Sequence, residues 1–282
     1  MNVRIIPRLD IKGPNLVKGI HLEGLRVLGK PENFAKFYYE NGADELFFQD
    51  TVASLYDRNS LHDIITKTAR EIFIPLTVGG GLRTIEDIRN VLRAGADKVA
   101  INTAAVKNPS FIYESAKKFG SSTIVVAIEA IKETNGKYFV FTDNGRERTG
   151  VEAIGWAKKA EELGAGEIVI TSVDREGTGS GYDIELIRRI SEAVSIPVIA
   201  HGGACCPQNI VSAILEGKAD AVAIASLFHY DYISKNKNET NEFDAEGNVS
   251  FLSSGKLFSK IKPCNLQDVR KAMIKSNIPT RH

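Results

Sequence analysis

The sequence has no excess of charge of either sign and no long apolar run. Its 282 residues carry 36 Lys and Arg against 35 Asp and Glu, a formal net charge of +1. This balance gives no electrostatic reason to expect a nucleic-acid or membrane-surface partner. No run of 18 or more apolar residues is present, so we expect no membrane span. The first residues also lack the pattern of a signal peptide.

Cysteine is scarce, and the few histidines are scattered. Cys205, Cys206 and Cys264 are an odd number at uneven spacing, which is typical of a reduced, cytoplasmic protein. The histidines show no metal-ligand spacing, and the GGG run lacks the G-x-G-x-x-G spacing of a dinucleotide site. We therefore expect no metal and no cofactor, and we interpret the adjacent cysteines as bystander thiols.

Short apolar runs alternate with helix-period segments along the chain. The expected strands are residues 4–9, 45–48, 74–78, 98–101, 123–128, 167–171, 196–200 and 221–224. They are apolar at nearly every position, as parallel strands buried on both faces are. Amphipathic segments such as 85–94 and 151–163 separate them. The alternation predicts an α/β fold in which residues 1–282 form a single (β/α)8 TIM barrel.

The two halves of the chain repeat each other. Residues 80–103 (GGLRTIEDIRNVLRAGADKVAINT) resemble residues 202–226 (GGACCPQNIVSAILEGKADAVAIAS). Upstream of them, IIPRLD at 5–10 aligns with IVVAIE at 124–129. This period is much longer than the roughly 20–50 residues of solenoid repeats. The repeat therefore predicts a barrel built from two similar half-barrels.

Three stretches depart from the alternation. Residues 11–30 form a long, Gly-bearing connection after the first strand, and loops of this length are often active-site lids. Residues 136–148 contain an Asp-Asn-Gly turn signal and predict a small β-hairpin after the fifth strand. Residues 231–262 are polar and poor in helix signals. We expect a surface insertion there, before a final helix at 265–276.

Two carboxylates end corresponding strands of the two halves. Asp10 follows the first strand and Glu129 the fifth. The reactive groups of a βα barrel lie at the C-terminal ends of its strands, so the two acids would face each other across the mouth. Such a pair suits general acid–base chemistry, with one group donating a proton while the other abstracts one. Acids at strand ends can also cap helices or pair with lysines, but the symmetric placement favours catalysis.

The same symmetry implies two phosphate sites. Paired glycines let backbone N–H groups approach an anion closely, and each pair is matched by a second strand-end loop. One site would consist of Gly80 and Gly81 with Asn102 and Thr103, the other of Gly202 and Gly203 with Ala225 and Ser226. Together they predict a substrate with a phosphate at each end.

Other groups are expected around this mouth. They are Asp50, Ser172, Glu176, Gly177 and Lys18. Lys18 either reaches a phosphate when its connection closes or is an ordinary solvated lysine, and spacing does not decide between these. His201, which ends the seventh strand, either touches the substrate or has a packing role.

The opposite end of the barrel carries four charges of alternating sign. Arg4, Glu45, Lys98 and Glu167 stand at the N-terminal ends of strands one, two, four and six, where they could form a ring of salt bridges. Such a ring is either a stability feature, which is usual for this face, or a gate for a small polar molecule.

The chain resembles the cyclase subunits of imidazole glycerol phosphate synthase, from histidine biosynthesis, over about residues 3–230. The resemblance rests on RIIPRLDIK, VKG, DELFFQD, VGGGLR, GADKVAINTAAVKNP, VVAIEA, GAGEIVITSVDREGTGSGYD and ADAVAIASLFH. It implies a heterodimer with a glutaminase subunit at the N-terminal face. Ammonia would enter through the four-charge ring and react with a ribulosyl aminoimidazole carboxamide ribonucleotide that carries two phosphates. The products would be imidazole glycerol phosphate and the aminoimidazole carboxamide ribotide.

The chain departs from that family at several positions. Glu129 stands where the family's second catalytic acid is an aspartate, and the extra methylene moves a carboxylate by roughly 1–1.5 Å. Glu176 also replaces an aspartate, Arg8 replaces a cysteine, and Cys205 and Cys206 replace small or polar residues. If Glu129 is a compromised acid, Glu129→Asp raises activity, whereas a fall would show that its surroundings fit glutamate.

Three functions are compatible with these residues. The first is the ammonia-dependent cyclase of histidine biosynthesis. The second is a paralogue that uses glutaminase-derived ammonia to aminate another substrate, such as a surface-glycan sugar. The third is a non-catalytic barrel that activates a glutaminase. The sibling isomerase of the pathway shares the half-barrel pattern but needs no ammonia gate, so the four charges favour the first two.

Overall fold

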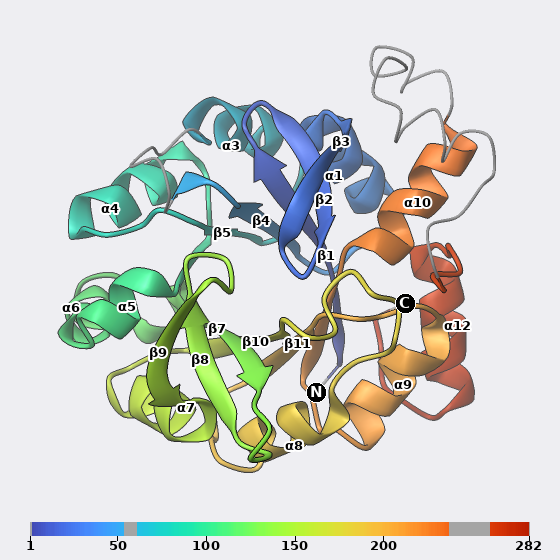
Figure 1. Cartoon of the computed structure of the whole chain (residues 1–282). Coiled ribbons are helices and arrows are strands. Elements are labelled where there is room, and N and C mark those ends of the chain that lie inside the picture. Colours follow the sequence, from blue (N-terminus) through green and yellow to red (C-terminus); the bar gives the residue numbers. More distant parts are fainter. Residues whose placement is uncertain (1, 54–60, 237–259, 282) are drawn as a thin grey trace.

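Eight parallel strands close into a barrel in the computed structural model, which describes residues 2–53, 61–236 and 260–281 (Figure 1). The barrel strands are β1 (Arg4–Lys12), β4 (Leu46–Asp50), β5 (Leu76–Gly79), β6 (Lys98–Ile101), β7 (Ile124–Lys132), β10 (Glu167–Ser172), β11 (Val198–His201) and β12 (Ala221–Ile224). They pair in the order β10-β11-β12-β1-β4-β5-β6-β7, and β7 pairs with β10 to complete the circle. The predicted TIM barrel is confirmed.

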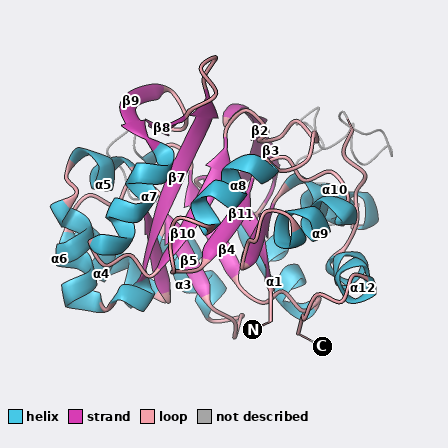
Figure 2. Cartoon of the chain, turned by 90° about the horizontal axis from the view of Figure 1, so that it is seen from below, coloured by secondary structure: helices cyan, strands magenta, loops and turns pink. Residues whose placement is uncertain are grey.

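Helices surround this barrel on the outside (Figures 1 and 2). They are α1 (Pro31–Glu40), α3 (His62–Ala69), α4 (Ile85–Ala94), α5 (Thr103–Lys107), α6 (Ser110–Phe119), α7 (Ala153–Glu162), α8 (Ile184–Ser191), α9 (Pro207–Leu215), α10 (Ser226–Lys235) and α12 (Leu266–Lys275), with a 3-10 turn η1 (Ser121–Thr123). In α4 the Thr84 side chain caps the helix reciprocally with Asp87, and Ile88 and Val91 on one face are buried. The local sequence thus sets both the start and the inner face of this helix.

Two antiparallel hairpins extend the C-terminal end of the barrel, one from each half (Figure 2). β2 (Asn15–Ile20) and β3 (Glu23–Gly29) follow β1, whereas β8 (Tyr138–Thr142) and β9 (Glu147–Glu152) follow β7. The second hairpin was predicted, and it is confirmed. The first lies where we expected a long, Gly-bearing connection, and this loop is in fact a hairpin because the segment pairs with the end of β1 and continues the sheet. The duplication therefore includes the hairpins.

The C-terminal part also differs from expectation. Helix α10 continues to Lys235, with Asp231, Tyr232 and Ile233 buried, so the polar insertion does not begin at residue 231. Tyr232 packs against Phe34 of α1, with 4.1 Å between ring centroids, and this apolar contact holds the end of α10 on the barrel. The part of the expected insertion at residues 237–259 lies outside the described residues. The final helix was predicted and forms as α12.

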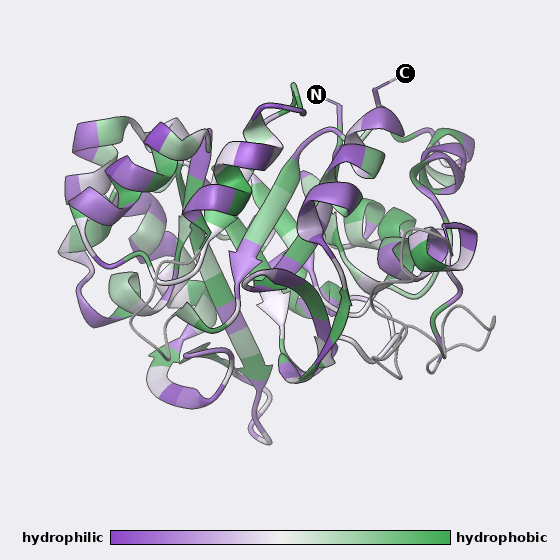
Figure 3. Ribbon diagram, turned by 90° about the horizontal axis from the view of Figure 1, so that it is seen from above, coloured by the Kyte–Doolittle hydropathy of each residue, from purple (hydrophilic) through white to green (hydrophobic). Residues whose placement is uncertain are grey.

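Side chains of the barrel strands point alternately outward and inward. Ile5 and Leu9 of β1 join the large core between strands and helices, whereas Ile6 joins a smaller cluster inside the barrel. This inner cluster, called the lumen cluster, consists of Ile6, Phe47, Ala100, Val125, Val169, Ile199, Ala221 and Ala223. Apolar residues accordingly follow the strands, while the outer sides of the helices are polar (Figure 3). The lumen is an apolar filling with polar groups above and below it.

A recurring aspartate explains part of the sequence repeat. Asp97 Oδ2 accepts a hydrogen bond from the backbone N–H of Leu76 at 2.8 Å, and Asp220 Oδ2 accepts one from Val198 at 2.9 Å. Each aspartate precedes one strand and accepts the first N–H of the strand before it, so it fixes the relative register of the two strands.

The helices of the described residues are all too short or too polar to span a membrane.

Candidate active site

Asp10 lies near the C-terminal end of β1 between two cations. Arg8 Nε donates to Asp10 Oδ1 at 2.9 Å, and Lys18 Nζ lies 3.9 Å from Oδ2. Burial by itself would raise the pKa of Asp10, but the charges of Arg8 and Lys18 outweigh it and hold the pKa below its usual value. Asp10 is therefore an ionised carboxylate at neutral pH.

Glu129 lies on β7, four strands from β1 in either direction and thus opposite Asp10 across the mouth. The backbone N–H of Gly145, in the turn between β8 and β9, donates to Glu129 Oε2 at 2.9 Å. Within the described ranges Glu129 forms no ion pair, and burial raises its pKa to about 7 against the lowering effects of Arg8 and Gly145. Glu129 therefore carries a proton in a large fraction of molecules near neutral pH, whereas Asp10 does not.

A cavity of about 220 Å³ opens beside Glu129 and is called here the Gly80 cavity. Its lining includes Gly80, Gly81, Asn102, Thr103, Asp50, Arg8 and Glu129. Gly80 has a φ of 100°, and a Cβ there would lie 2.3 Å from the carbonyl oxygen of Asp50, so only glycine fits. Asn102 is half-buried, and its buried Oδ1 atom has no hydrogen-bond partner among the described residues. An open, polar cavity thus lies where one of the two phosphate sites is expected.

The second expected phosphate site is a much smaller hollow of about 20 Å³, called the Gly202 hollow. It is lined by Gly202, Gly203, Ala225, Ser226, Glu176, Gly177, Lys18 and His201, with Ile261 over it. Helix α10 begins at this hollow, and no side chain caps its first turn, so its dipole favours an anion there. The volume holds about one water molecule, so a phosphate can enter only if a lining side chain moves.

Ile261 is one of the residues that line the Gly202 hollow. It is almost fully buried, and a Cβ on Gly179 would lie 2.9 Å from its side chain. The next residue, Lys262, donates its backbone N–H to the carbonyl of Cys205 at 2.9 Å. The segment that follows residue 259 is therefore fastened across two of the loops that surround the hollow.

Lys18 is buried on β2 and is not a solvated lysine. Its ammonium group contacts Glu176 Oε1 in addition to Asp10. The other carboxylate oxygen of Glu176 accepts the backbone N–H of Leu22 at 2.9 Å. Burial would lower the pKa of Lys18, but Glu176 and Asp10 outweigh it and raise the pKa. Glu176 thus holds the first hairpin down over the mouth.

Arg8 lies between the two cavities. Its Nη1 is 3.2 Å from His201 Nδ1, and its guanidinium carbon is 5.5 Å from the centre of the Phe47 ring. A guanidinium group can only donate, so His201 Nδ1 accepts and carries no proton. Burial, followed by the charges of Arg8 and Lys18, holds the pKa of His201 well below its usual value. His201 is therefore a neutral hydrogen-bond partner here.

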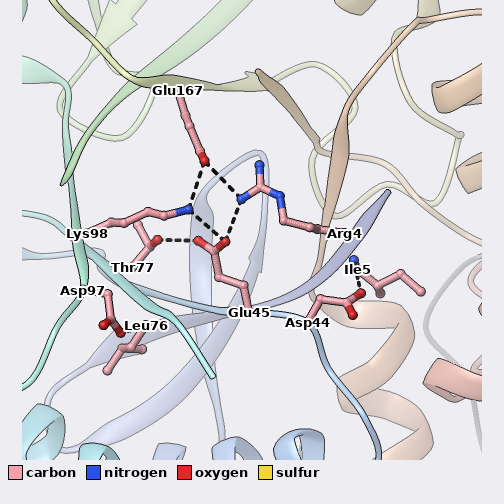
Figure 4. A network of polar contacts seen from close by, with 9 residues as sticks. All are labelled: Arg4, Ile5, Asp44, Glu45, Leu76, Thr77, Asp97, Lys98 and Glu167. Carbon is pink, nitrogen blue, oxygen red and sulfur yellow. Dashed lines mark hydrogen bonds and ion pairs between the residues drawn. The ribbon is translucent and has the colours of Figure 1, made fainter. Parts of the chain in front are cut away.

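The four charges at the N-terminal end form a closed ring (Figure 4). Arg4 contacts Glu45 at 2.7 Å and Glu167 at 3.2 Å, and Lys98 contacts the same acids at 3.1 and 3.0 Å. Thr77 Oγ1 also donates to Glu45 at 2.6 Å. The ring stands below the lumen cluster, and its two positive and two negative side chains balance in charge.

The structure assembles most of the expected residues but not all of them. Ser172 lines neither cavity, and its buried hydroxyl has no partner in the described part of the chain. Its neighbour Thr171 points inward instead, with Oγ1 3.1 Å from His201 Nδ1. Strand alternation in β10, which puts Glu167 and Val169 inside, could have identified Thr171. Asp50 lines the Gly80 cavity, but its Oδ1 accepts the N–H groups of Val52 and Ala53.

Sequence reasoning also missed several polar groups of the Gly80 cavity. They are Gln49, Lys107, Asp143 and Asn144. The last two belong to the turn of the second hairpin, and only the folded hairpin brings that turn to the mouth. In the described ranges there is no group of three His, Cys, Asp or Glu side chains that could hold a metal ion.

Comparison with known proteins gives consistent relatives. The model of the family described as "Histidine biosynthesis protein" matches residues 4–234. The chain is 59% identical over 202 residues to imidazole glycerol phosphate synthase subunit HisF of Legionella pneumophila, which covers 72% of this chain and 95% of that protein. It is 50% identical over 243 residues to the subunit of the same name from Alkaliphilus metalliredigens (strain QYMF), which covers 86% of this chain and 96% of that protein.

Proposed function

The chain belongs to the histidine biosynthesis protein family, and from this membership we propose how its residues carry out the family's cyclase reaction. Its activity is that of the cyclase subunit of imidazole glycerol phosphate synthase. Relatives at 50% and 59% identity support this activity over a different amination or a purely regulatory barrel. The observation that carries the residue assignment is the pair of opposed acids, Asp10 and Glu129, at a mouth where a cavity and a hollow lie at the two paired-glycine loops.

The two acids move the protons of the reaction. Ammonia adds to the ribulosyl carbonyl of the substrate, and one water leaves to give an imine. The imine nitrogen then closes the imidazole ring by forming a second N–C bond, and the C–N bond to the aminoimidazole carboxamide ribotide breaks. Addition and water loss each place one proton on an oxygen and remove one from a nitrogen, whereas the last step places a proton on the nitrogen that leaves. A buried carboxylate on one side of the mouth and a buried carboxylic acid on the other can accept and donate these protons.

The paired-glycine sites hold the two ends of the substrate. One phosphate occupies the Gly80 cavity, where Asn102 and Thr103 lie at the wall. The other occupies the Gly202 hollow, at the start of α10, after Lys18 or Ile261 has moved. Lys18 then exchanges part of its contact with Glu176 for the phosphate. Opening of the first hairpin therefore accompanies substrate binding.

A direct assay tests this function. The purified chain is mixed with an ammonium salt and the bisphosphorylated ribulosyl substrate, and both products are followed by chromatography and mass spectrometry. We expect both products to form in equal amounts without any added metal or cofactor. Failure to consume this substrate, with a folded protein, would refute the proposed activity.

The N-terminal face is the side from which ammonia arrives. We place a glutaminase subunit there, in a heterodimer, because the ring of Arg4, Glu45, Lys98 and Glu167 leads into the lumen cluster. Ammonia is small and uncharged, so it can cross an apolar lumen that excludes ions. The complex would be cytoplasmic, where the thiols of the three cysteines stay free.

An exposed aromatic residue marks the same face. Phe73 is 82% exposed and borders a hollow of about 380 Å³ that is lined mostly by apolar residues, Ile72, Ile74 and Pro75 among them. Asp97, next to Lys98 of the ring, lies at the edge of this hollow. A large exposed aromatic side chain beside a surface hollow is typical of a protein interface, and its position next to the four-charge ring favours the glutaminase as the partner.

We expect Lys98→Ala to separate the two sources of ammonia. The substitution removes two of the four contacts of the ring, so it leaves Glu45 and Glu167 joined only by Arg4. Turnover with a free ammonium salt should change less than about threefold, whereas glutamine-dependent turnover in the complex should fall roughly tenfold. Lys218→Ala, which removes an exposed ion pair with Glu192, is the matched control. Equal losses with both nitrogen sources would contradict the gate.

A further inference from the structure

Arg8 is the charged residue that interacts differently with the two acids, Asp10 and Glu129. It lies on β1 two residues before Asp10, is 4% exposed and lines the Gly80 cavity. It makes a direct ion pair with Asp10, with 2.9 Å between Nε and Oδ1. No such pair joins Arg8 to Glu129 in the chain as described, although both line the same cavity. The surroundings of the two acids therefore differ through Arg8, which forms an ion pair with Asp10 and none with Glu129.

The guanidinium of Arg8 is held from three sides. Asp10 accepts from Nε, His201 accepts from Nη1 at 3.2 Å, and the Phe47 ring lies beneath the cation. Because a guanidinium is planar and its donors form a rigid fork, these contacts fix its orientation. His201 accepts only in its neutral form, and its burial keeps it neutral. Arg8 is thus a fixed positive charge at the floor of the mouth.

We propose that Arg8 is a positioning residue that divides the two proton-transfer roles, holding Asp10 as the ionised base and leaving Glu129 as the proton donor. This inference rests on the proposed acid–base function of the pair. It goes further because it says which acid does which task, and because it assigns this division to Arg8, which contacts both Asp10 and His201.

The groups that face Asp10 support this division. Arg8 on β1 and Lys18 on β2 are cations, and His229 on α10 is neutral because burial lowers its pKa to about 3. Lys18 is shared with Glu176, which it also contacts. Arg8 is therefore the cation that belongs to Asp10 most directly.

The surroundings of Glu129 raise its pKa, whereas those of Asp10 lower the pKa of that acid. Burial raises its pKa most, Arg8 and the Gly145 N–H lower it, and the negative charges of Asp10 and Asp143 raise it. Arg8 acts on Glu129 only through space, whereas it acts on Asp10 through a hydrogen bond as well. The same cation therefore stabilises one carboxylate more than the other.

The protons exchanged by Asp10 and Glu129 balance over ammonia addition and water loss. When the N–C bond forms, the carbonyl electron pair moves to oxygen, which takes the proton of Glu129, while Asp10 takes a proton from the new ammonium group. When that oxygen leaves as water, it takes the proton from Asp10, and the nitrogen returns a proton to Glu129. Both acids are then restored, and no other reactant is needed.

The pH dependence of turnover tests the proposal. Turnover needs ionised Asp10 and protonated Glu129, so the wild type should lose activity above about pH 7 and show no acidic limb down to about pH 5.5. In Arg8→Gln both carboxyls lose a cation. The pKa of Asp10 should then rise by at least about one unit, so that an acidic limb appears in the profile, and the alkaline limb, which follows Glu129, should move upward by less. Un-ionised ammonia and ionic strength are held constant across the series.

Two further variants separate this role from a structural one. Arg8→Lys keeps the charge and should restore most of the wild-type profile, whereas Arg189→Gln, at an exposed arginine of α8, should leave it unchanged. A profile of Arg8→Gln that is lower in height, keeps the alkaline limb in place and shows no acidic limb would overturn the proposal and make Arg8 only structural.

Infrared titration of the ligand-free protein tests the same point without any substrate. The wild type should show one buried protonated carboxyl that titrates near pH 7 and disappears in Glu129→Gln. In Arg8→Gln a second buried protonated carboxyl should appear that titrates at lower pH. This second band should disappear when Asp10→Asn is added to Arg8→Gln. Absence of the second band would overturn the proposal even if the cyclase activity is correct. Its presence would uphold the proposal even if the substrate proved to be a different one.

Discussion

Asp10→Asn is expected to lower cyclase turnover by about 10³-fold with either nitrogen source. The amide cannot accept a proton, so the variant lacks the base while it keeps the shape of the side chain. It also leaves Arg8 and Lys18 facing a neutral group in a buried place. Steady-state kinetics with saturating ammonium salt measures the loss, and kcat should carry most of it because the phosphate sites are untouched.

Stability has to be measured beside this activity. Removal of one partner from a buried ion pair typically lowers the free energy of unfolding by about 3–5 kcal/mol, and Asn retains part of the hydrogen bonding. Asp63→Asn, at an exposed residue in the first turn of α3, is the matched control and should keep both activity and melting temperature. If folded Asp10→Asn turns over within about tenfold of the wild type, Asp10 is not the base.

The strands and their order could be predicted because burial of a strand on both faces requires a short, continuous apolar run in the sequence. Every barrel strand begins within two residues of the start of its expected apolar run, although β1 and β7 extend three and four residues beyond the expected end, and the half-repeat gives the positions of Asp10 and Glu129 directly. The errors lie where a contact distant in sequence decides the structure. The segment after β1 carries few apolar residues in alternation, yet it pairs with the end of β1 and forms a hairpin.

The site was predictable in its residue types but not in its contacts. Two paired glycines predict two anion sites, and a cavity and a hollow lie at those positions. The partners of Lys18 depend on where Glu176 arrives from the loop after β10, which no local pattern encodes. Ser172 was expected in place of Thr171 because a strand end was located to within one residue, and a shift of one residue turns a side chain to the other face.

Glu129→Asp is expected to lower turnover by roughly 10- to 100-fold. Aspartate is one methylene shorter, so its carboxylate withdraws from the N–H of Gly145, which now donates to Glu129 Oε2 at 2.9 Å. Gly145 belongs to the turn of the second hairpin and has a φ of 74°, so this donor sits in a backbone conformation that resists adjustment. The surroundings are therefore built for glutamate, although the family has aspartate at this position.

The pH profile distinguishes a misplaced acid from an altered one. A shorter side chain that stays equally buried keeps a raised pKa, so the alkaline limb near pH 7 should remain while the height falls. Glu129→Gln should lose activity at every pH, and Glu162→Asp, at an exposed ion pair on α7, should change nothing. A rise in turnover for Glu129→Asp would instead show that the extra methylene costs this barrel activity. The Gly145 contact would then hold the acid away from the reacting oxygen rather than toward it.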